Sequence, residues 1–314
     1  MISFTESIHK CLYLKGINDM SLDRKHNEER FQEFKKEGNV LDNAILCEAI
    51  ADDNLLWNPS EALYWRKQGI AIREQICGKH NIDNTPYCDK IVEVLLEKGS
   101  YKEAIKWNTK SMKIKMKEKG EGGAEVLINK LLLAEALSLL YNDDESKAEA
   151  DQAYNILENN ISTYDQEMAY KAYLKLVHIY SCYNIGAQSH NLKLTLQNEV
   201  CGDKAIQIAK AFYGEQSIET AEAIRRKAIT LGYDKQAAIA LFAEAIKIFM
   251  NFDENKKYAR TIFHNVRQKW EGDNVLVESA KWLYDNSSEK FVLTAIEDFA
   301  DSEKIKIKQA LGLS

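Results

Sequence analysis

Residues 59–70 read PSEALYWRKQGI, and this stretch contains an alanine, Ala62, whose position recurs through the chain. The corresponding positions lie 42, 44, 50, 40 and 42 residues apart, at Ala62, Ala104, Ala148, Asn198, Ala238 and Ala280. A small or short residue follows each after seven positions, at Gly69, Ser111, Asn155, Ala205, Ala245 and Ser287. A repeat of about this length indicates stacked supersecondary units that share one continuous core.

The composition indicates that these units are helical. The 314 residues include only two prolines, Pro59 and Pro86, and 14 glycines. Ala, Leu, Glu and Lys dominate the long periodic segments, and all four are good helix formers. Residues seven apart lie on one face of a helix, so small side chains there let two helices approach closely. We therefore predict an all-α solenoid of about six helix pairs.

Helix boundaries follow from capping residues and glycines. Asn58-Pro59-Ser60-Glu61 and Ser100 with Glu103 predict two helix starts with capping boxes. Gly78 and Gly99 suit helix ends. The predicted helices cover residues 40–53, 59–77, 86–98, 100–120, 124–141, 144–159, 164–183, 217–231, 234–250, 256–270 and 273–285.

The chain divides into three parts on this basis. Residues 1–39 lie outside the repeat and are expected to form an N-terminal helical cap or a partner-docking arm. The solenoid is predicted over residues 40–286, and capping helices over 287–314. The longest interval contains NIGAQSHNLK (184–193), which predicts an inserted loop or an extended helix end.

Two stretches resemble tetratricopeptide repeat (TPR) proteins of the kinesin-light-chain type. GIAIREQICGKHNIDNT (69–85) and AIQIAKAFYGEQSIETA (205–221) are similar to the junction between successive repeats in that family. The matching residues are Ile72, Arg73, Glu74 and Gly78 in the first stretch and Ala205, Ile208, Gly214, Thr220 and Ala221 in the second. The family's His-Pro pair is replaced by Asn81-Ile82 and Ser217-Ile218. The resemblance implies a right-handed superhelix in which the first helix of each pair, the A helix, lines a concave groove.

Charge and hydropathy exclude several classes of protein. The net charge is −6 and no long basic run occurs, which argues against bulk nucleic-acid binding. No stretch approaches 18 uninterrupted apolar residues, and the first residues lack a signal-peptide pattern. The six cysteines form no CxxC motif and are expected to be reduced. We expect a cytoplasmic, bacterial protein that binds neither nucleic acid nor membranes.

No catalytic or metal-binding motif stands out. The chain has no GxxxxGK[ST], GxGxxG or GxSxG sequence. His178 and Cys182 are four residues apart on a predicted helix, but two ligands do not make a metal site. We expect no enzymatic activity, no cofactor and no bound metal.

Candidate partner-binding residues lie on the predicted A helices. Arg225 and Arg226 lie on the fifth, and Arg260, His264 and Arg267 follow one face of the sixth at i, i+4 and i+7. Arginine recognises carboxylate or phosphate groups through paired hydrogen bonds, so these residues predict a cationic patch. The alternative is that they pair with acids on neighbouring helices or lie in solvent.

Two further A helices contribute candidates. Tyr173 and Tyr180 lie on the fourth A helix, which is apolar nearly all round and is either a binding wall or part of the core. Asn129 and Lys130 lie on the third A helix as groove residues.

These observations favour a non-catalytic scaffold or adaptor that binds an acidic or extended segment of another protein or peptide. The alternative is a regulatory subunit or sensor whose superhelix changes when a peptide or small anion binds. The sequence leaves the oligomeric state open.

Overall fold

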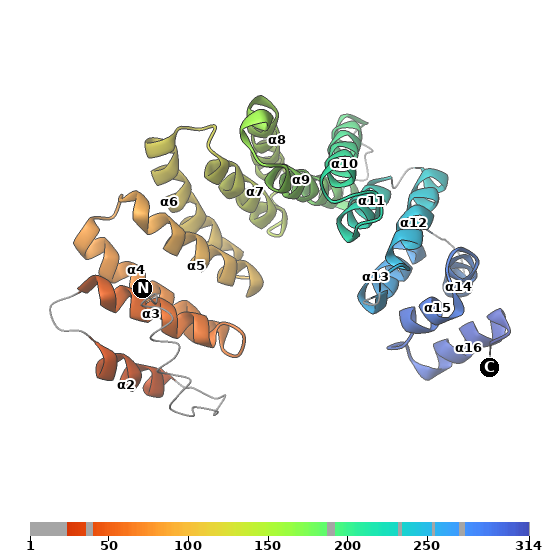
Figure 1. The fold of residues 1–314 in the computed structure, drawn as a ribbon, viewed down its shortest axis with the longest axis horizontal. Coiled ribbons are helices and arrows are strands. Elements are labelled where there is room, and N and C mark those ends of the chain that lie inside the picture. Colours follow the sequence, from red (N-terminus) through yellow and green to blue (C-terminus); the bar gives the residue numbers. More distant parts are fainter. Residues whose placement is uncertain are drawn as a thin grey trace. The chain divides into compact units, whose positions relative to one another are not determined.

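A computed structural model describes residues 24–35, 40–186, 192–231, 234–252, 255–269 and 274–313 (Figure 1). Within these ranges the chain forms fifteen α-helices and two short 3-10 helices, and it contains no strand. The predicted all-α class is therefore confirmed. No helix in the described part of the chain is long and apolar enough to cross a membrane.

The helices of the first half are α2 (Arg24–Phe34), α3 (Val40–Asn54), α4 (Pro59–Cys77), α5 (Thr85–Glu97), α6 (Tyr101–Lys119), α7 (Ala124–Ser138) and α8 (Asp143–Asn160). Those of the second half are α9 (Gln166–Gly186), α10 (Leu192–Phe212), α11 (Ile218–Thr230), α12 (Lys235–Phe249), α13 (Asn255–Arg267), α14 (Val275–Asn286), α15 (Glu289–Ala295) and α16 (Asp301–Leu311). The 3-10 helices are Ile82–Asn84 and Ile161–Thr163. The predicted insertion at 184–193 lies partly outside the described residues, since 187–191 are not described.

The chain divides into two compact units, Met1–Ile156 (unit 1) and Leu157–Ser314 (unit 2). Consecutive helices pack as pairs, namely α3 with α4, α5 with α6, α9 with α10 and α11 with α12. The last helices depart from this pattern, because α15 packs on α13 and α16 packs on α14. The predicted divisions at residues 39 and 286, with caps on either side, stay a prediction.

Hydrogen bonds between repeats show that the pairs form two layers. First helices contact first helices, as Lys90 of α5 donates to Glu48 of α3 at 3.2 Å. Second helices contact second helices, as Lys67 of α4 donates to Glu103 of α6 at 2.6 Å. We call the first helices the A layer of each unit, α3, α5 and α7 in unit 1 and α9, α11 and α13 in unit 2, and their partners the B layer.

Small residues allow the two layers to approach closely. Ala62, Ala104, Asn198, Ala238 and Ala280 are all fully buried, as the repeat predicts. A Cβ added at Gly69 of α4 would meet the backbone oxygen of Ala44 and the Cβ of Cys47 at 3.2 Å. The helices of the first pair would therefore have to separate to accept any larger side chain at Gly69.

The predicted register is wrong in the third repeat. Ala148 and Asn155 are exposed, whereas Ser146 and Ala153 are fully buried. Ser146 lies 42 residues after Ala104, so the interval is constant across unit 1. Serine can replace alanine here because its hydroxyl donates to the backbone oxygen of Ala134 at 2.5 Å.

Helix starts are partly as predicted. The Asn58 side chain accepts a hydrogen bond from the Glu61 amide at 3.2 Å and Pro59 is the first residue of α4, which confirms this N-cap. Neither predicted capping box forms as a whole. The carboxylate of Glu61 instead accepts from the Trp65 indole at 2.7 Å, and Ser100 makes no side-chain cap.

The ends of α5 and α7 share one geometry at corresponding positions. The Ser100 amide donates to the Leu95 carbonyl at 2.8 Å, and the Asn142 amide donates to the Leu137 carbonyl at 3.0 Å. The residue before each donor has a positive φ, 69° at Gly99 and 58° at Tyr141. Glycine is preferred at this position because a Cβ is strained there, so Tyr141 holds a conformation that costs folding free energy.

Overpacking one buried alanine should destabilise the fold. We expect Ala238→Leu to lower the free energy of unfolding by roughly 1–3 kcal/mol, because Ala238 is fully buried between layers. Ala240→Leu on the same helix is the control, since Ala240 is exposed. Urea unfolding followed by circular dichroism measures the free energy of unfolding of both variants. Equal effects of the two changes would contradict a close contact between the helix layers at Ala238.

Relieving the strain at Tyr141 should stabilise the fold. We expect Tyr141→Gly to raise the free energy of unfolding by about 1 kcal/mol, because glycine adopts positive φ without penalty. Gly99→Ala, the reverse change at the corresponding turn, should lower it by about 1 kcal/mol. If Tyr141→Gly instead lowers the free energy of unfolding in the same urea experiment, the tyrosine ring supports the fold.

Candidate binding surfaces

Asn129, on α7, is fully buried in a network that joins three helices of unit 1. Its Nδ2 donates to Asn108 Oδ1 at 2.6 Å and to Asp89 Oδ1 at 3.3 Å. Its Oδ1 accepts from Lys115 Nζ at 2.8 Å. Because both ends of this amide are engaged within the protein, Asn129 fixes α5, α6 and α7 relative to each other rather than presenting itself to a partner.

Asp89 is the accessible member of the same network, with 28% of its side chain exposed. Its carboxylate accepts from Ser111 Oγ and from Lys115 Nζ, both at 2.6 Å. Lys130, next to Asn129, is also buried and donates to Glu149 at 2.9 Å and to Gln152 at 2.7 Å. The two polar residues predicted on α7 therefore hold helices together.

A second polar network joins α3, α4 and α5. Glu48 Oε2 accepts from Arg66 Nη1 at 2.9 Å and from Lys90 Nζ at 3.2 Å. Arg66 Nη2 also pairs with Asp52 at 2.9 Å. Burial raises the pKa of Glu48 and outweighs the opposing effect of Arg66 and Lys90.

Sequence reasoning missed both networks, although the repeat carries a signal for them. Glu48 and Asp89 are 41 residues apart, and Arg66 and Asn108 are 42 apart. A search for polar residues recurring with the repeat would have found an acid on the A helix facing a polar side chain on the B helix.

Tyr173 and Tyr180, on α9 of unit 2, are both buried. The Tyr173 hydroxyl donates to Glu158 at 2.5 Å, and the Tyr180 hydroxyl accepts from Gln197 at 3.0 Å. Of the two alternatives for these tyrosines, a binding wall or part of the core, their burial fits the core.

Arg225 and Arg226, on α11, share the carboxylate of Glu222. Arg225 contacts it at 2.7 and 2.6 Å and Arg226 at 2.8 Å, and Arg225 also donates to Asn265 of α13 at 2.8 Å. Burial raises the pKa of Glu222, but the hydrogen bonds from the two arginines outweigh burial and leave the pKa below its ordinary value. This cluster ties α11 to α13.

The side chains predicted on one face of α13 differ in their partners. Arg260 pairs with Asp298 and, at 3.3 Å, with Glu297, and 36% of its side chain is exposed. His264 is exposed and contacts Gln268 at 3.1 Å. Arg267 is exposed and makes no ion pair with any described residue. The structure thus places three of the nine predicted residues together at an accessible surface, the α13 face.

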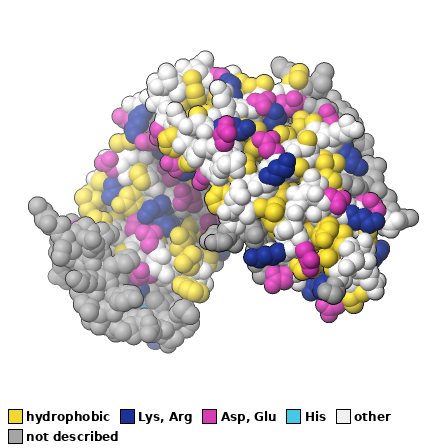
Figure 2. Space-filling model, turned by 45° about the vertical axis from the view of Figure 1, so that its right-hand side comes forward, with side chains coloured by type: hydrophobic (Ala, Val, Ile, Leu, Met, Phe, Trp, Pro, Cys, Tyr) yellow, Lys and Arg dark blue, Asp and Glu magenta, His cyan; other side chains and the backbone are white. Residues whose placement is uncertain are grey.

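The rest of the surface mixes both signs of charge. Figure 2 shows basic and acidic side chains interspersed over the visible face. No group of three or more His, Cys, Asp or Glu residues that could hold a metal occurs in the described ranges. Cys47 and Cys88 are free and buried, and burial raises the pKa of each thiol to about 12. Neither thiol is therefore ionised and ready for nucleophilic chemistry at neutral pH.

The stability of unit 2 should depend on pH through Glu222. Because its folded pKa lies below the ordinary value of 4.5, Glu222 stabilises the fold above that value and loses this contribution as the pH falls below it. We expect Glu222→Gln to destabilise at neutral pH by roughly 1–3 kcal/mol and the difference from wild type to shrink in acid. Glu278→Gln, at an exposed acid, is the control in thermal unfolding across pH, and a difference that persists in acid would contradict this role.

The chain matches no known protein family by sequence, and no curated protein matches it. Solved structures do match its fold. The repeats of a putative kinesin light chain from Podosopora anserina, described as nearly identical and TPR-like, superpose with a TM-score of 0.57 at 13% identity. That match covers 69% of this chain and 99% of the other.

A second match covers almost the whole chain. The Rap conjugation gene regulator of the plasmid pLS20, solved in complex with the Phr* peptide, has a TM-score of 0.52 at 15% identity. The match covers 98% of this chain and 93% of the regulator. Together with the paired helices and the 42-residue interval, these matches show that the chain has the α-solenoid fold of TPR-like repeat proteins.

Proposed function

We propose that this protein is a non-catalytic scaffold or adaptor that binds an extended, acidic segment of a partner protein on the A layer of unit 2. The observation that carries this proposal is the α13 face, where Arg267 is exposed and has no ion pair among the described residues. An unpaired guanidinium can form two parallel hydrogen bonds with a partner carboxylate.

The neighbouring side chains support a binding role in different ways. His264 is exposed one turn before Arg267 and can add a second contact. Arg260 is half-exposed, and a partner carboxylate would compete with Asp298 and Glu297 for it. An acidic segment would therefore gain most from Arg267 and His264.

Arg225, which is buried, and Arg226, which is partly exposed, support the same surface from α11. Arg225 and Arg226 are committed to Glu222, and Arg225 holds Asn265, the residue after His264. In α9, Tyr170 donates to the Glu219 carbonyl at 2.7 Å and so ties α9 to α11. A layer fixed in this way loses little conformational freedom when a partner binds, which favours affinity.

A regulatory subunit or peptide sensor is the second candidate. The observation that favours it is that the structurally similar Rap regulator was solved with a bound peptide. A sensor would bind a short peptide or a small anion and change the arrangement of its helices in response.

Affinity capture from the native host's lysate, read by mass spectrometry, tests the scaffold proposal. We expect one partner to be captured by the wild type and its yield to fall roughly tenfold with Arg267→Glu combined with His264→Ala, because charged contacts are removed and one is reversed. Lys247→Glu is the matched control, since Lys247 is exposed on α12 in the B layer.

Two outcomes would contradict the scaffold proposal. A partner retained by the double variant, with unchanged helical content, would place its site away from the α13 face. Capture of no protein, combined with a thermal shift on adding an acidic peptide, would favour the sensor instead.

A further inference from the structure

The turns between A and B helices lie along one edge of unit 1 (Figure 1). This edge carries the turns α3–α4, α5–α6 and α7–α8. Trp57, Gly99 and Tyr141 occupy corresponding positions in them, each 42 residues from the next. The first and third turns also have similar sequences, LLWN (55–58) and LLYN (139–142), which differ only in the aromatic residue.

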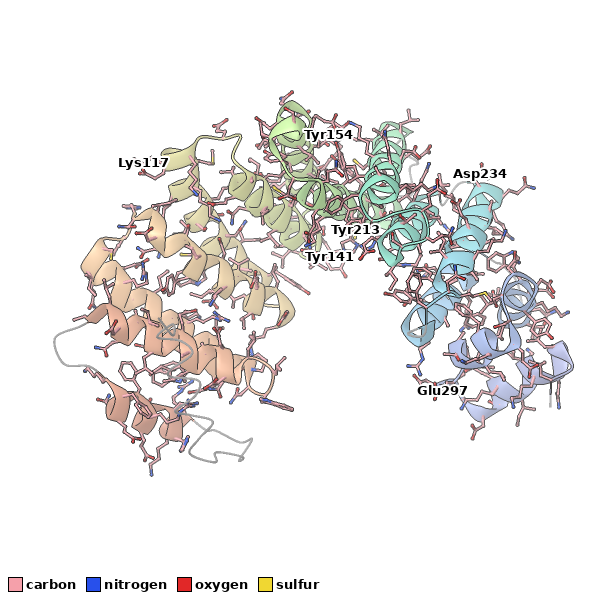
Figure 3. The ribbon with its side chains drawn as sticks, viewed as in Figure 1. Lys117, Tyr141, Tyr154, Tyr213, Asp234 and Glu297 are labelled. Carbon is pink, nitrogen blue, oxygen red and sulfur yellow. The ribbon has the colours of Figure 1, made fainter. Side chains whose placement is uncertain are left out.

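Both aromatic rings on this edge are exposed. Trp57 is 64% exposed and Tyr141 is 91% exposed, at the end of α7 (Figure 3). Neither ring contacts another aromatic ring or a cation within the described residues. Leu56, beside Trp57, is 83% exposed and extends the apolar surface.

Tyr141 is unfavourable for the folded chain considered alone. Its φ of 58° is one that glycine adopts in the preceding turn, and its ring buries almost no surface. Strained residues cluster at binding and switch sites, so an exposed aromatic side chain at such a position is a candidate for contact with another molecule.

The charged side chains around Trp57 and Tyr141 indicate what kind of molecule would bind to these rings. Glu97, Asp143 and Asp144 are exposed on this edge, and none forms an ion pair within the described part of the chain. Of the cations near these turns, Lys98 donates to Ser60 Oγ at 2.5 Å, and Lys102 at the start of α6 is exposed. Aromatic faces beside unpaired carboxylates suit guanidinium and ammonium groups, which are attracted to both.

We propose that this loop edge is a docking surface for a basic, extended segment of a partner protein. Trp57 and Tyr141 each receive an arginine or lysine side chain, and Asp143 and Asp144 pair with the cation at Tyr141. The two rings are two repeats apart, roughly 20 Å at about 10 Å between neighbouring helices. An extended segment of about six residues covers that distance.

This surface is independent of the α13 face. It lies in unit 1, at the ends of helices, and it attracts the opposite charge. The two proposals are tested with different variants and different probes, so a negative result for one does not affect the other.

Fluorescence anisotropy at low ionic strength tests the loop edge. The probe is a fluorescein-labelled peptide of alternating arginine and serine, compared with its glutamate–serine counterpart. We expect the arginine peptide to bind and the glutamate peptide not to bind. Trp57→Ser combined with Tyr141→Gly should weaken binding roughly tenfold, as should Asp143→Asn combined with Asp144→Asn.

The controls are exposed residues at the opposite edge of unit 1. Ile76→Ser, at the end of α4, matches the aromatic change, and Glu118→Gln with Glu121→Gln, around the end of α6, matches the acidic change. Both should bind as the wild type does. Because glycine suits the backbone at Tyr141, loss of binding in that variant is separable from loss of folding.

Several results would overturn the proposal. If the aromatic variant binds the arginine peptide with wild-type affinity, the rings do not take part, even if the acidic variant binds more weakly. Binding would then be explained by general attraction between opposite charges. Equal binding of both peptides, or no binding of the arginine peptide, would exclude a cation site. Sedimentation measures whether the protein associates with itself. If the wild type does so and the aromatic variant does not, the edge binds a second copy of the chain instead.

Discussion

The close approach of paired helices at small residues is the constraint on which the rest of the structure depends. Small residues lie 42 apart at Ala62, Ala104 and Ser146 in unit 1 and at Ala238 and Ala280 in unit 2, and they bring these B helices against their A helices. A Cβ added at Gly69 would already meet the backbone oxygen of Ala44 at 3.2 Å. The same contact fixes the rotation of every helix about its axis. It therefore decides which side chains reach the A layer, which reach the turns and which enter the core.

The polar networks of the A layer follow from that rotation. They place Glu48 and Asp89 opposite Lys90 and Lys115 from the next helices, so these charges are matched within the chain. A matched layer is rigid but offers little to a partner. Among the accessible groups that have no ion pair with a described residue, Arg267 on α13 and the carboxylates beside Tyr141 are the ones on which the proposals depend.

The fold could be predicted from the sequence because the interval and the helix-forming composition act over many residues. The register of one repeat could not, since serine at 146 satisfies its hydroxyl with the Ala134 carbonyl and so replaces alanine without an apolar signal. Site residues were harder to predict. Asn129 and Arg225 have the residue types of a binding groove, but only the structure shows that Asp89, Lys115 and Glu222 already engage them. Tyr141 was missed because the positive φ of this residue shows only in the structure, although its 42-residue spacing from Gly99 is visible in the sequence.

The buried thiols of Cys47 and Cys88 have a consequence for the motions of unit 1. Both lie on A helices at corresponding positions 41 residues apart, and both are protonated and shielded from solvent. Reagents that attack thiolates can reach them only when the first or second helix pair opens. These two cysteines are thus natural reporters of how often neighbouring repeats separate.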